Sequence, residues 1–198
     1  MPQVMTLTKN LSPAHRDALT AHFLALGAED RRLRFGTPTS DAAIRAYVAR
    51  IDFDRDAAFG VFADNLSLLG VAHVAVFEGV AELGVSVLEG HRRLGIGSAL
   101  FDRASGFARN RFIRTLFMHC LSENTAIMRI ARRSQMKIVA SGGEADAHLE
   151  LPPLDAATIA AEFLQERVAL FDYNLKAQVL TARRLQRALV ASGTAGPD

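Results

Sequence analysis

The residues with the clearest chemical potential form a short glycine-bearing segment, Arg92-x-x-Gly95-x-Gly97. An alternating strand pattern precedes it over residues 80–88, and a helical pattern follows from Ala99. A turn between a strand and a helix leaves the first N–H groups of the helix free, and these groups attract an anion together with the helix dipole. Glycines let a phosphate approach the backbone without meeting a Cβ atom. The segment therefore predicts a site for a phosphate or pyrophosphate group.

Three phosphate-binding patterns compete for this segment. A Walker loop requires a Lys-Ser/Thr pair after its last glycine, and no such pair follows Gly97. A dinucleotide fingerprint requires a third glycine where this chain has Leu100, and an acidic ribose partner that is also missing. The third pattern, Arg/Gln-x-x-Gly-x-Gly/Ala, is satisfied. A glycine-containing turn that binds nothing is the remaining alternative.

The run from Ala81 to Leu100 resembles the central motif of the GNAT N-acetyltransferases, and the order of predicted elements from Val4 to Leu151 is similar too. The resemblance implies acetyl-CoA as co-substrate and transfer of its acetyl group to a primary amine by direct attack on the thioester. It implies that the cofactor pyrophosphate is held by the backbone of seven residues: Arg92, Arg93, Leu94, Gly95, Ile96, Gly97 and Ser98.

Three further residues match cofactor-binding positions of the family. Main-chain groups of Val85 and Val87 are expected to hydrogen-bond the pantetheine arm, and one of the two N–H groups polarises the thioester carbonyl. Asn124 opens a predicted helix and matches an asparagine that contacts the cofactor in this family. A plain N-cap role explains Asn124 equally well.

The candidate general base is Glu82, an acidic residue inside an otherwise apolar strand. It matches an acidic position that some family members use to deprotonate the amine. If Glu78-Gly79 forms a two-residue turn, Ala75 lies opposite Glu82 and His73 shares its face one diagonal away, at roughly 7–8 Å. We therefore predict Glu82 and His73 as a catalytic proton relay. A surface carboxylate paired with an arginine is the alternative.

The sequence departs from the family at the general acid. A tyrosine commonly lies seven residues after the asparagine, and this chain has Ala131 there; the helix-ending glycine is replaced by Gln135. Cys120 and Ser122 are two candidates for the general acid, and the sequence does not rank one above the other. This departure is compatible with a second hypothesis, a non-catalytic acyl-CoA sensor that keeps the phosphate loop.

The sequence says less about the acceptor amine than about the cofactor. Residues 29–35 resemble weakly a stretch in the acetyltransferase domains of bacterial protein-lysine acetyltransferases, although a charged helix end would look the same. We therefore expect a small-molecule amine or a protein lysine as partner. No group of His, Cys, Asp or Glu has metal-ligand spacing, so no metal is expected.

Alternating and helical patterns predict an α/β fold, a mixed and mostly antiparallel GNAT-type sheet with helices on both faces. The predicted first strand is Val4–Leu7, and predicted helices start at Ser12-Pro13 and at Ser40-Asp41. We predict an acetyltransferase domain over residues 1–153, a C-terminal helical extension over 154–191 and a disordered tail over 192–198.

The C-terminal extension carries an apolar stripe at helical spacing. The stripe must be covered by its own domain or by a second copy in a homodimer, and its mixed opposite face argues against a membrane. A protein whose sole role is interaction through this helix is a third hypothesis. Its apolar residues are Leu164, Val168, Phe171, Leu175, Val179, Ala182, Leu185 and Leu189.

Length, composition and charge limit the partners and the cellular compartment that we expect for the chain. The chain has 198 residues, a net charge of +2, 49% hydrophobic residues and a single cysteine. The small net charge indicates neither nucleic acid nor an anionic membrane as partner. With one cysteine, no secretory pattern and no membrane-spanning run, we expect a cytoplasmic enzyme.

Overall fold

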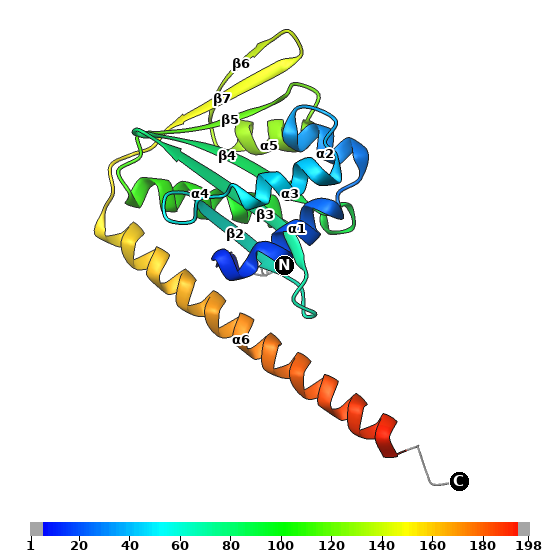
Figure 1. Ribbon diagram of the computed structural model, residues 1–198. Helices are drawn as coiled ribbons and strands as arrows, with labels where there is room; N and C mark the ends of the chain where they lie inside the picture. The colour runs from blue at the N-terminus through cyan, green and yellow to red at the C-terminus, as the bar shows by residue number, and fades with distance from the viewer. Residues whose placement is uncertain (1–5, 194–198) are drawn as a thin grey trace.

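A seven-stranded sheet forms the centre of the structure, a computed structural model that describes residues 6–193 (Figure 1). All neighbouring strands run antiparallel except β4 and β5, which are parallel. From one side of the sheet to the other, the strands are β1 (Lys9–Asn10), β2 (Ala57–Phe62), β3 (Leu68–Phe77), β4 (Val80–Val87), β5 (Thr115–Leu121), β7 (Glu144–Glu150) and β6 (Lys137–Ser141).

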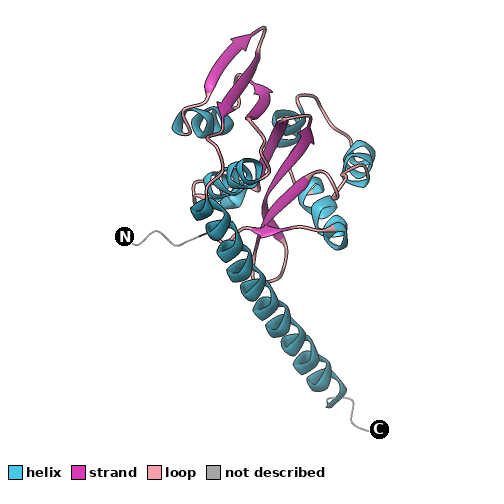
Figure 2. Ribbon diagram, turned by 90° about the vertical axis from the view of Figure 1, so that its left-hand side faces the viewer, coloured by secondary structure: helices cyan, strands magenta, loops and turns pink. Residues whose placement is uncertain are grey.

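Helices cover both faces of the sheet, with α1 and α3 on one face and α4 and α5 on the other (Figures 1 and 2). Leu19, Phe23 and Ile44 anchor the core on the α1 face, while Leu100 and Leu116 belong to the core on the α4 face. The helical elements are η1 (Pro13–His15), α1 (Arg16–Leu24), α2 (Ala28–Phe35), α3 (Asp41–Ala49), η2 (Glu89–His91), α4 (Ile96–Asn110), α5 (Thr125–Arg133) and α6 (Ala156–Gly193).

The parallel strands β4 and β5 separate partway along their length. Their pairing starts at Val80 with Thr115 and ends at Glu82 with Phe117, yet β4 continues to Val87 and β5 to Leu121. We call the space between the two strands beyond Glu82 and Phe117 the wedge. The wedge opens the middle of the sheet, where a ligand can reach backbone groups that a neighbouring strand would otherwise occupy.

The predicted fold class is confirmed, including the helices on both faces and the C-terminal helix. The predicted first strand is wrong: Thr6 and Leu7 are not in a strand, and the first strand is Lys9–Asn10. Val4 and Met5 lie outside the described residues. Helix α6 continues to Gly193, into the segment for which a disordered tail is predicted, and residues 194–198 also lie outside the described part.

Local chemistry explains the helix ends that the sequence predicts. Ser40 caps α3 by accepting a hydrogen bond from the N–H of Ala43 at 3.2 Å. Helix α2 was not predicted as a separate helix, because none of its residues is buried and it has no apolar periodicity. Gly36 ends it in the left-handed conformation, at φ 77°. Within residues 6–193, no helix has the length and apolar character needed to cross a bilayer.

Candidate functional site

A cavity of about 370 Å³ lies at the mouth of the wedge. Four parts of the fold form its walls: helix α2, the end of β4, the loop into α4, and the start of α5. All of the predicted cofactor-binding residues except Leu94 line it: Val85, Val87, Arg92, Arg93, Gly95, Ile96, Gly97, Ser98 and Asn124. Leu94 lies in the same loop with its side chain 65% exposed.

The backbone of β4 presents free groups to the wedge. The N–H of Leu88 donates to the carbonyl of Leu69 at 2.9 Å, which makes these residues a hydrogen-bonded antiparallel pair. Hydrogen-bonded and non-hydrogen-bonded pairs alternate, so the N–H and C=O groups of Val85 and Val87 face away from β3 and into the wedge. The Nε of Arg92 already donates to the carbonyl of Val87 at 3.3 Å, which agrees with this direction.

The loop from β4 ends at the N-terminus of α4 with its donors free. Gly95 is the N-cap in a left-handed conformation, φ 83°, and no side chain caps the helix. The N–H groups of Ile96, Gly97 and Ser98 therefore have no partner within the helix. A Cβ atom on Gly97 would lie 3.1 Å from Cδ1 of Ile130, so a side chain there would crowd the cavity wall. The arrangement fits a phosphate group.

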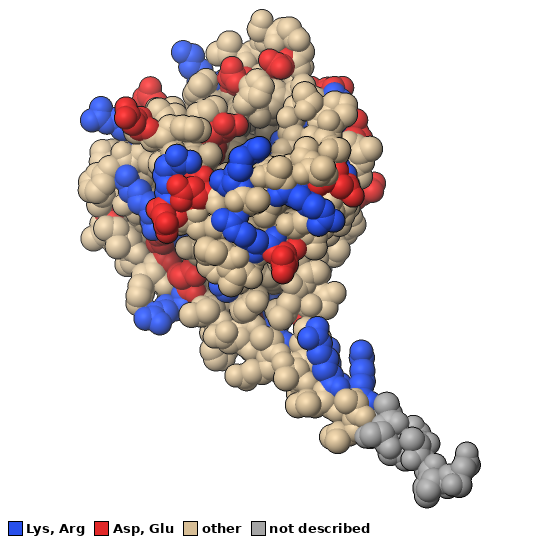
Figure 3. Space-filling view, in the orientation of Figure 1, with Lys and Arg blue, Asp and Glu red and all other residues tan. Residues whose placement is uncertain are grey.

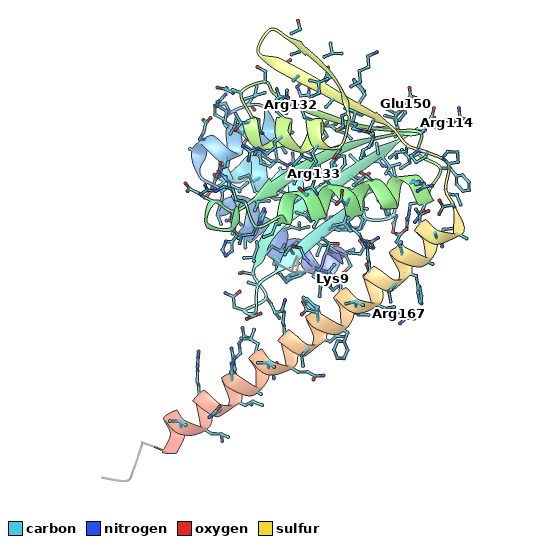
Figure 4. The ribbon with its side chains drawn as sticks, turned by 180° about the vertical axis from the view of Figure 1, so that it is seen from behind. Lys9, Arg114, Arg132, Arg133, Glu150 and Arg167 are labelled. Carbon is cyan, nitrogen blue, oxygen red and sulfur yellow. The ribbon has the colours of Figure 1, made fainter. Side chains whose placement is uncertain are left out.

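Positive charge surrounds the cavity. Arg92, Arg93 and Arg129 contribute to its walls, and Asp30 of α2 is the one acidic residue among its lining side chains. Asp30 forms an ion pair with Arg92 at 2.5 Å, which links α2 to the loop. At the end of α5, Arg133 donates to the hydroxyl of Ser98 at 3.1 Å, as its position beside α4 allows (Figure 4). The excess of arginine matches the charge of a pyrophosphate ligand.

Asn124 performs the capping role considered from the sequence. Its side-chain oxygen accepts a hydrogen bond from the N–H of Ile127 at 3.2 Å. Its side-chain nitrogen donates to the carbonyl of Leu33 at 3.2 Å and so joins α5 to α2. Both contacts hold the side chain at the cavity wall. A cofactor contact by Asn124 stays a prediction.

Glu82 lies at the apex of the wedge, as the last residue of β4 that pairs with β5. The predicted register is confirmed, because Glu82 lies opposite Ala75 and His73 lies opposite Gly84. Neither Glu82 nor His73 belongs to the cavity wall, and no hydrogen bond or ion pair joins them among the described residues. The contacts of His73 are with Tyr47 and Asp56 instead, so the relay stays a prediction.

His73 ends a polar chain on the α1 face of the sheet. The guanidinium of Arg34 donates to the hydroxyl of Tyr47 at 3.0 Å, so Tyr47 can donate its own proton to Nδ1 of His73, 2.7 Å away. Nε2 of His73 then carries the proton and faces Asp56 at 3.6 Å. Burial, together with the charge of Arg34, lowers the pKa of His73 to about 4, and Asp56 opposes both.

A second buried histidine bonds β4 directly. Nδ1 of His22 donates to the carbonyl of Leu68 at 2.9 Å, so Nε2 accepts the proton of the Ser86 hydroxyl at 2.8 Å. Burial lowers the pKa of His22 to about 4, although its hydrogen bond to the carbonyl of Leu68 opposes this. Helix α1 is thereby fixed to the part of β4 that has lost its β5 neighbour.

Sequence reasoning missed several of these residues. Arg34 covers the backbone at Gly84, where an added Cβ atom would lie 2.2 Å from its guanidinium nitrogen. Gly84, a glycine inside β4, indicates that something approaches the strand closely, but it does not identify Arg34 as that partner. His22 and Ser86 are 64 positions apart, so their contact has no local signature. Ala131 is fully buried and carries no acid chemistry, while Gln135 adopts φ 56°, the conformation a glycine would favour.

Among the residues that the structure describes, no group of three or more His, Cys, Asp or Glu side chains could hold a metal ion. Residues 23–135 match the model of the acetyltransferase (GNAT) family. No curated protein sequence shows significant similarity to the chain.

Solved structures share the fold at low sequence identity. The GNAT domain of S. lividans PAT has a TM-score of 0.63 at 16% identity, over 73% of this chain and 89% of that domain. A ribosomal-protein-alanine N-acetyltransferase from Brucella melitensis has a TM-score of 0.57 at 17% identity, over 73% and 99%. RimL, a ribosomal alpha-N-protein acetyltransferase solved in complex with coenzyme A, has a TM-score of 0.57 at 19% identity, over 76% and 97%.

Proposed function

Because the chain belongs to the GNAT acetyltransferase family, we propose that it is an acetyl-CoA-dependent N-acetyltransferase acting on a primary amine. One observation carries the proposal: the free backbone groups of β4 and the uncapped N-terminus of α4 meet in a single arginine-rich cavity. The first can bind an extended amide-containing arm, and the second can bind a pyrophosphate. Coenzyme A contains both groups, joined in one linear molecule.

We assign cofactor binding to groups that the cavity brings together. Val85 and Val87 hydrogen-bond the pantetheine arm through their main chain, as a neighbouring strand would. The N–H groups of Ile96, Gly97 and Ser98 hold the pyrophosphate, with Arg92, Arg93 and Leu94 supplying the rest of the loop. Acetyl-CoA supplies an activated acetyl group when bound. An N–H group of β4 that faces the wedge stabilises negative charge on the thioester oxygen.

We assign the general base to Glu82. Its position at the apex of the wedge sets a carboxylate next to the point where β4 loses its neighbour, where the reacting end of the arm would lie. A carboxylate there can accept the proton of the attacking amine, directly or through one water. His73 is neutral near pH 7 and can pass a proton only through an intermediate group, because Tyr47 and Asp56 are its contacts.

No dedicated acid is required for the leaving thiolate. The family tyrosine position is the buried Ala131, and the pKa of a free thiol is about 8.5, so a thiolate can leave without a proton donor at modest cost. The same absence favours the second candidate function, an acyl-CoA sensor that binds the cofactor without turnover.

We propose a protein amine as the first acceptor class to test, with small amines as the alternative. Helix α2 forms one wall of the cavity, and it is the segment that resembles protein-lysine acetyltransferase domains. Two of the similar structures are named as acetyltransferases of ribosomal proteins. An acceptor panel should therefore include peptides with lysine and with an N-terminal alanine.

Titration calorimetry with acetyl-CoA and coenzyme A tests the binding half of the proposal. We expect micromolar affinity for the wild type and no binding for Gly97→Glu, because the added side chain fills the phosphate site. Gly106→Glu is the matched control: it lies on the same helix, where an added Cβ atom meets nothing within 4 Å. Equal affinities of all three proteins would refute the phosphate site at Gly97, and no binding to the wild type would refute both the enzyme and the sensor.

Release of coenzyme A thiol in the presence of the acceptor panel tests the catalytic half. Turnover with one acceptor class, absent in Gly97→Glu, supports the transferase. Tight binding without turnover across lysine peptides, N-terminal alanine peptides and small amines would favour the sensor instead.

A further inference from the structure

Helix α6 contacts its own domain through a largely polar face. Arg103 of α4, with its side chain 3% exposed, pairs with Glu162 at 3.3 Å and with Glu166 at 2.9 Å. Further along, Lys176 donates to the carbonyl of Phe62 at 3.1 Å, and the ring of Tyr173 packs on the Phe62 ring at 4.8 Å. Ion pairs, hydrogen bonds and the contacts of the Tyr173 ring with Phe62 and His15 therefore dock the helix, mostly without its apolar stripe.

From Phe171 onward the apolar stripe of α6 lies on the side away from the domain, whereas Leu164 and Val168 line a hollow beside α4. Its large members are strongly exposed: Leu164 is 64% exposed, Phe171 72%, Leu175 50% and Leu185 61%. In a helix these residues are about half a turn from Glu162, Glu166 and Tyr173. Exposed apolar groups aligned over several turns indicate an interaction surface, because monomeric proteins rarely leave such patches open.

The spacing of the stripe is that of a coiled coil. Val168, Leu175 and Ala182 are seven residues apart, as are Phe171, Gln178 and Leu185. The two series alternate at steps of three and four, the a and d positions of a heptad repeat. Such a seam fits a second helix of similar length rather than a flat surface or a groove.

The second half of α6 projects beyond the domain. Residues 181–190 are all exposed, and Figure 1 shows the helix extending away from the sheet. Isolated helical segments of this size are marginal in water, so a partner along the stripe would stabilise the projecting part.

Charge distinguishes the two ends of α6. Its first half holds Glu162, Glu166 and Asp172 with one basic residue, Arg167. Its second half holds only basic charges: Lys176, Arg183, Arg184 and Arg187. In Figure 3 the visible surface of the projecting part is accordingly blue and tan, without red. Glu162 and Glu166 face the domain, and Arg184 and Arg187 lie on the same side of the helix. The sizes of the stripe residues, rather than these charges, therefore decide how a second copy pairs.

We propose that α6 is a homodimerisation helix, which pairs with α6 of a second copy in antiparallel orientation along the apolar stripe. A register centred between Leu175 and Gln178 sets the large Phe171 against the small Ala182 of the second copy. It also sets Val168 against Leu185. Large-to-small packing at successive layers is what a well-filled helix interface requires.

Light scattering coupled to size exclusion, on the full chain over a wide concentration range, tests the dimer. We expect twice the 21.5 kDa monomer mass for the wild type and the monomer mass for Phe171→Glu/Leu175→Glu. Leu170→Glu is the matched control, since this neighbouring leucine is 38% exposed but lies outside the stripe, and it should stay dimeric. Equal midpoints of thermal unfolding for the domain would show that the variants fold.

Cysteine crosslinking tests the orientation. Gln178→Cys lies near the centre of the antiparallel pair and should form a disulfide with its own copy under mild oxidation. Gln186→Cys should not, because the two sites would be about 28 Å apart along the axis at 1.5 Å per residue. The natural Cys120 is buried, so it does not compete.

A monomeric wild type overturns the proposal, as does a dimer that survives Phe171→Glu/Leu175→Glu. A wild type that stays monomeric yet sediments with vesicles containing phosphatidylserine would assign the stripe to a membrane instead. A disulfide at Gln186→Cys, whether or not Gln178→Cys also forms one, would overturn the antiparallel orientation.

Discussion

Two neutral histidines occupy the α1 face of the sheet beside the wedge. His22 and His73 each have a pKa lowered to about 4, chiefly by burial, so both rings are uncharged near pH 7. Their hydrogen bonds define which nitrogen carries the proton in each ring. Neutral rings add no positive charge to this side of the strand, where the guanidinium of Arg34 already covers Gly84.

Acidification should destabilise the protein through these histidines. Between pH 6.5 and pH 4 an unfolded histidine binds a proton that the folded His22 does not, so the free energy of unfolding falls as the pH falls through this window. The loss is about 2 kcal/mol per histidine on going from about pH 7.5 to about pH 5. Urea denaturation at both pH values should show His22→Gln losing less stability than the wild type.

His148→Gln, which removes an exposed histidine, serves as the control and should keep the wild-type pH dependence. Identical slopes for His22→Gln and the wild type would mean that His22 is protonated in the folded state. Carboxylates with lowered pKa values, such as Asp56 and Glu162, act in a separate and more acidic window.

Glu82→Gln should lower kcat by about 10²- to 10⁴-fold, the usual range for a lost general base, with acetyl-CoA affinity unchanged. The acidic limb of the pH–rate profile should disappear with it. Glu78→Gln, in the exposed turn of the same hairpin, is the control and should keep full activity. Steady-state kinetics over a pH series would decide the matter; unchanged turnover would leave Glu82 a structural residue.

At the scale of elements, α2 bridges the two sides of the wedge without a buried residue of its own. Asp30 connects it to Arg92 on the β4 side, while Arg32 pairs with Glu123 at 2.7 Å on the β5 side. Polar ties of this kind exchange more readily than apolar packing. Helix α2 is therefore the wall of the cavity that can adjust when a ligand enters.

Asp30→Asn should tighten coenzyme A binding. The carboxylate of Asp30 competes with the ligand phosphates for Arg92, and release of a partly exposed ion pair is worth about 1 kcal/mol, or roughly fivefold in Kd. Calorimetry against Asp41→Asn, which breaks the ion pair of α2 with α3 instead, isolates the effect. Weaker binding by Asp30→Asn would mean that Asp30 positions Arg92 rather than competing for it.

The elements also show where sequence reasoning holds and where it fails. The Arg92–Ser98 loop and the Ala75–Glu82 register follow from short-range chemistry, namely glycine spacing and a two-residue turn. Helix α2 is not predicted because its residues are at most half-buried and most are charged, so the sequence has no apolar periodicity there. Strand β1 is not predicted either, because two residues are too few to show an alternating pattern.

At the scale of the whole molecule, the unpredicted features are contacts between distant segments. Asp30 with Arg92 and His22 with Ser86 join parts of the chain more than sixty positions apart, and nothing in either partner's neighbourhood identifies the other. Helix α6 reverses the expectation for an amphipathic helix, because its acidic residues face the domain. Arg103, buried in α4, supplies the physical reason: a buried guanidinium must be paired.

Removing the two glutamates of α6 and removing Arg103 should therefore lower the free energy of unfolding by different amounts. Glu162→Gln/Glu166→Gln leaves Arg103 buried without a carboxylate, which should lower the free energy of unfolding by about 3–5 kcal/mol. Arg103→Met should cost far less, because the glutamates keep Arg111 and solvent as partners. Urea denaturation of both variants measures the difference; equal costs would show that packing, not charge, fixes the helix.

The wedge between β4 and β5 has a consequence for self-association. A strand edge with open peptide groups is a template for aggregation, which proteins usually suppress with charges, bulges or a covering helix. Here the open groups of Val85 and Val87 lie inside the sheet, with β5 on the far side and α2 bridging the opening. A slender linear ligand can reach them, whereas a strand from another chain is hindered by β5. The open peptide groups of the sheet are thus placed where a ligand reaches them more easily than a second copy of the chain does.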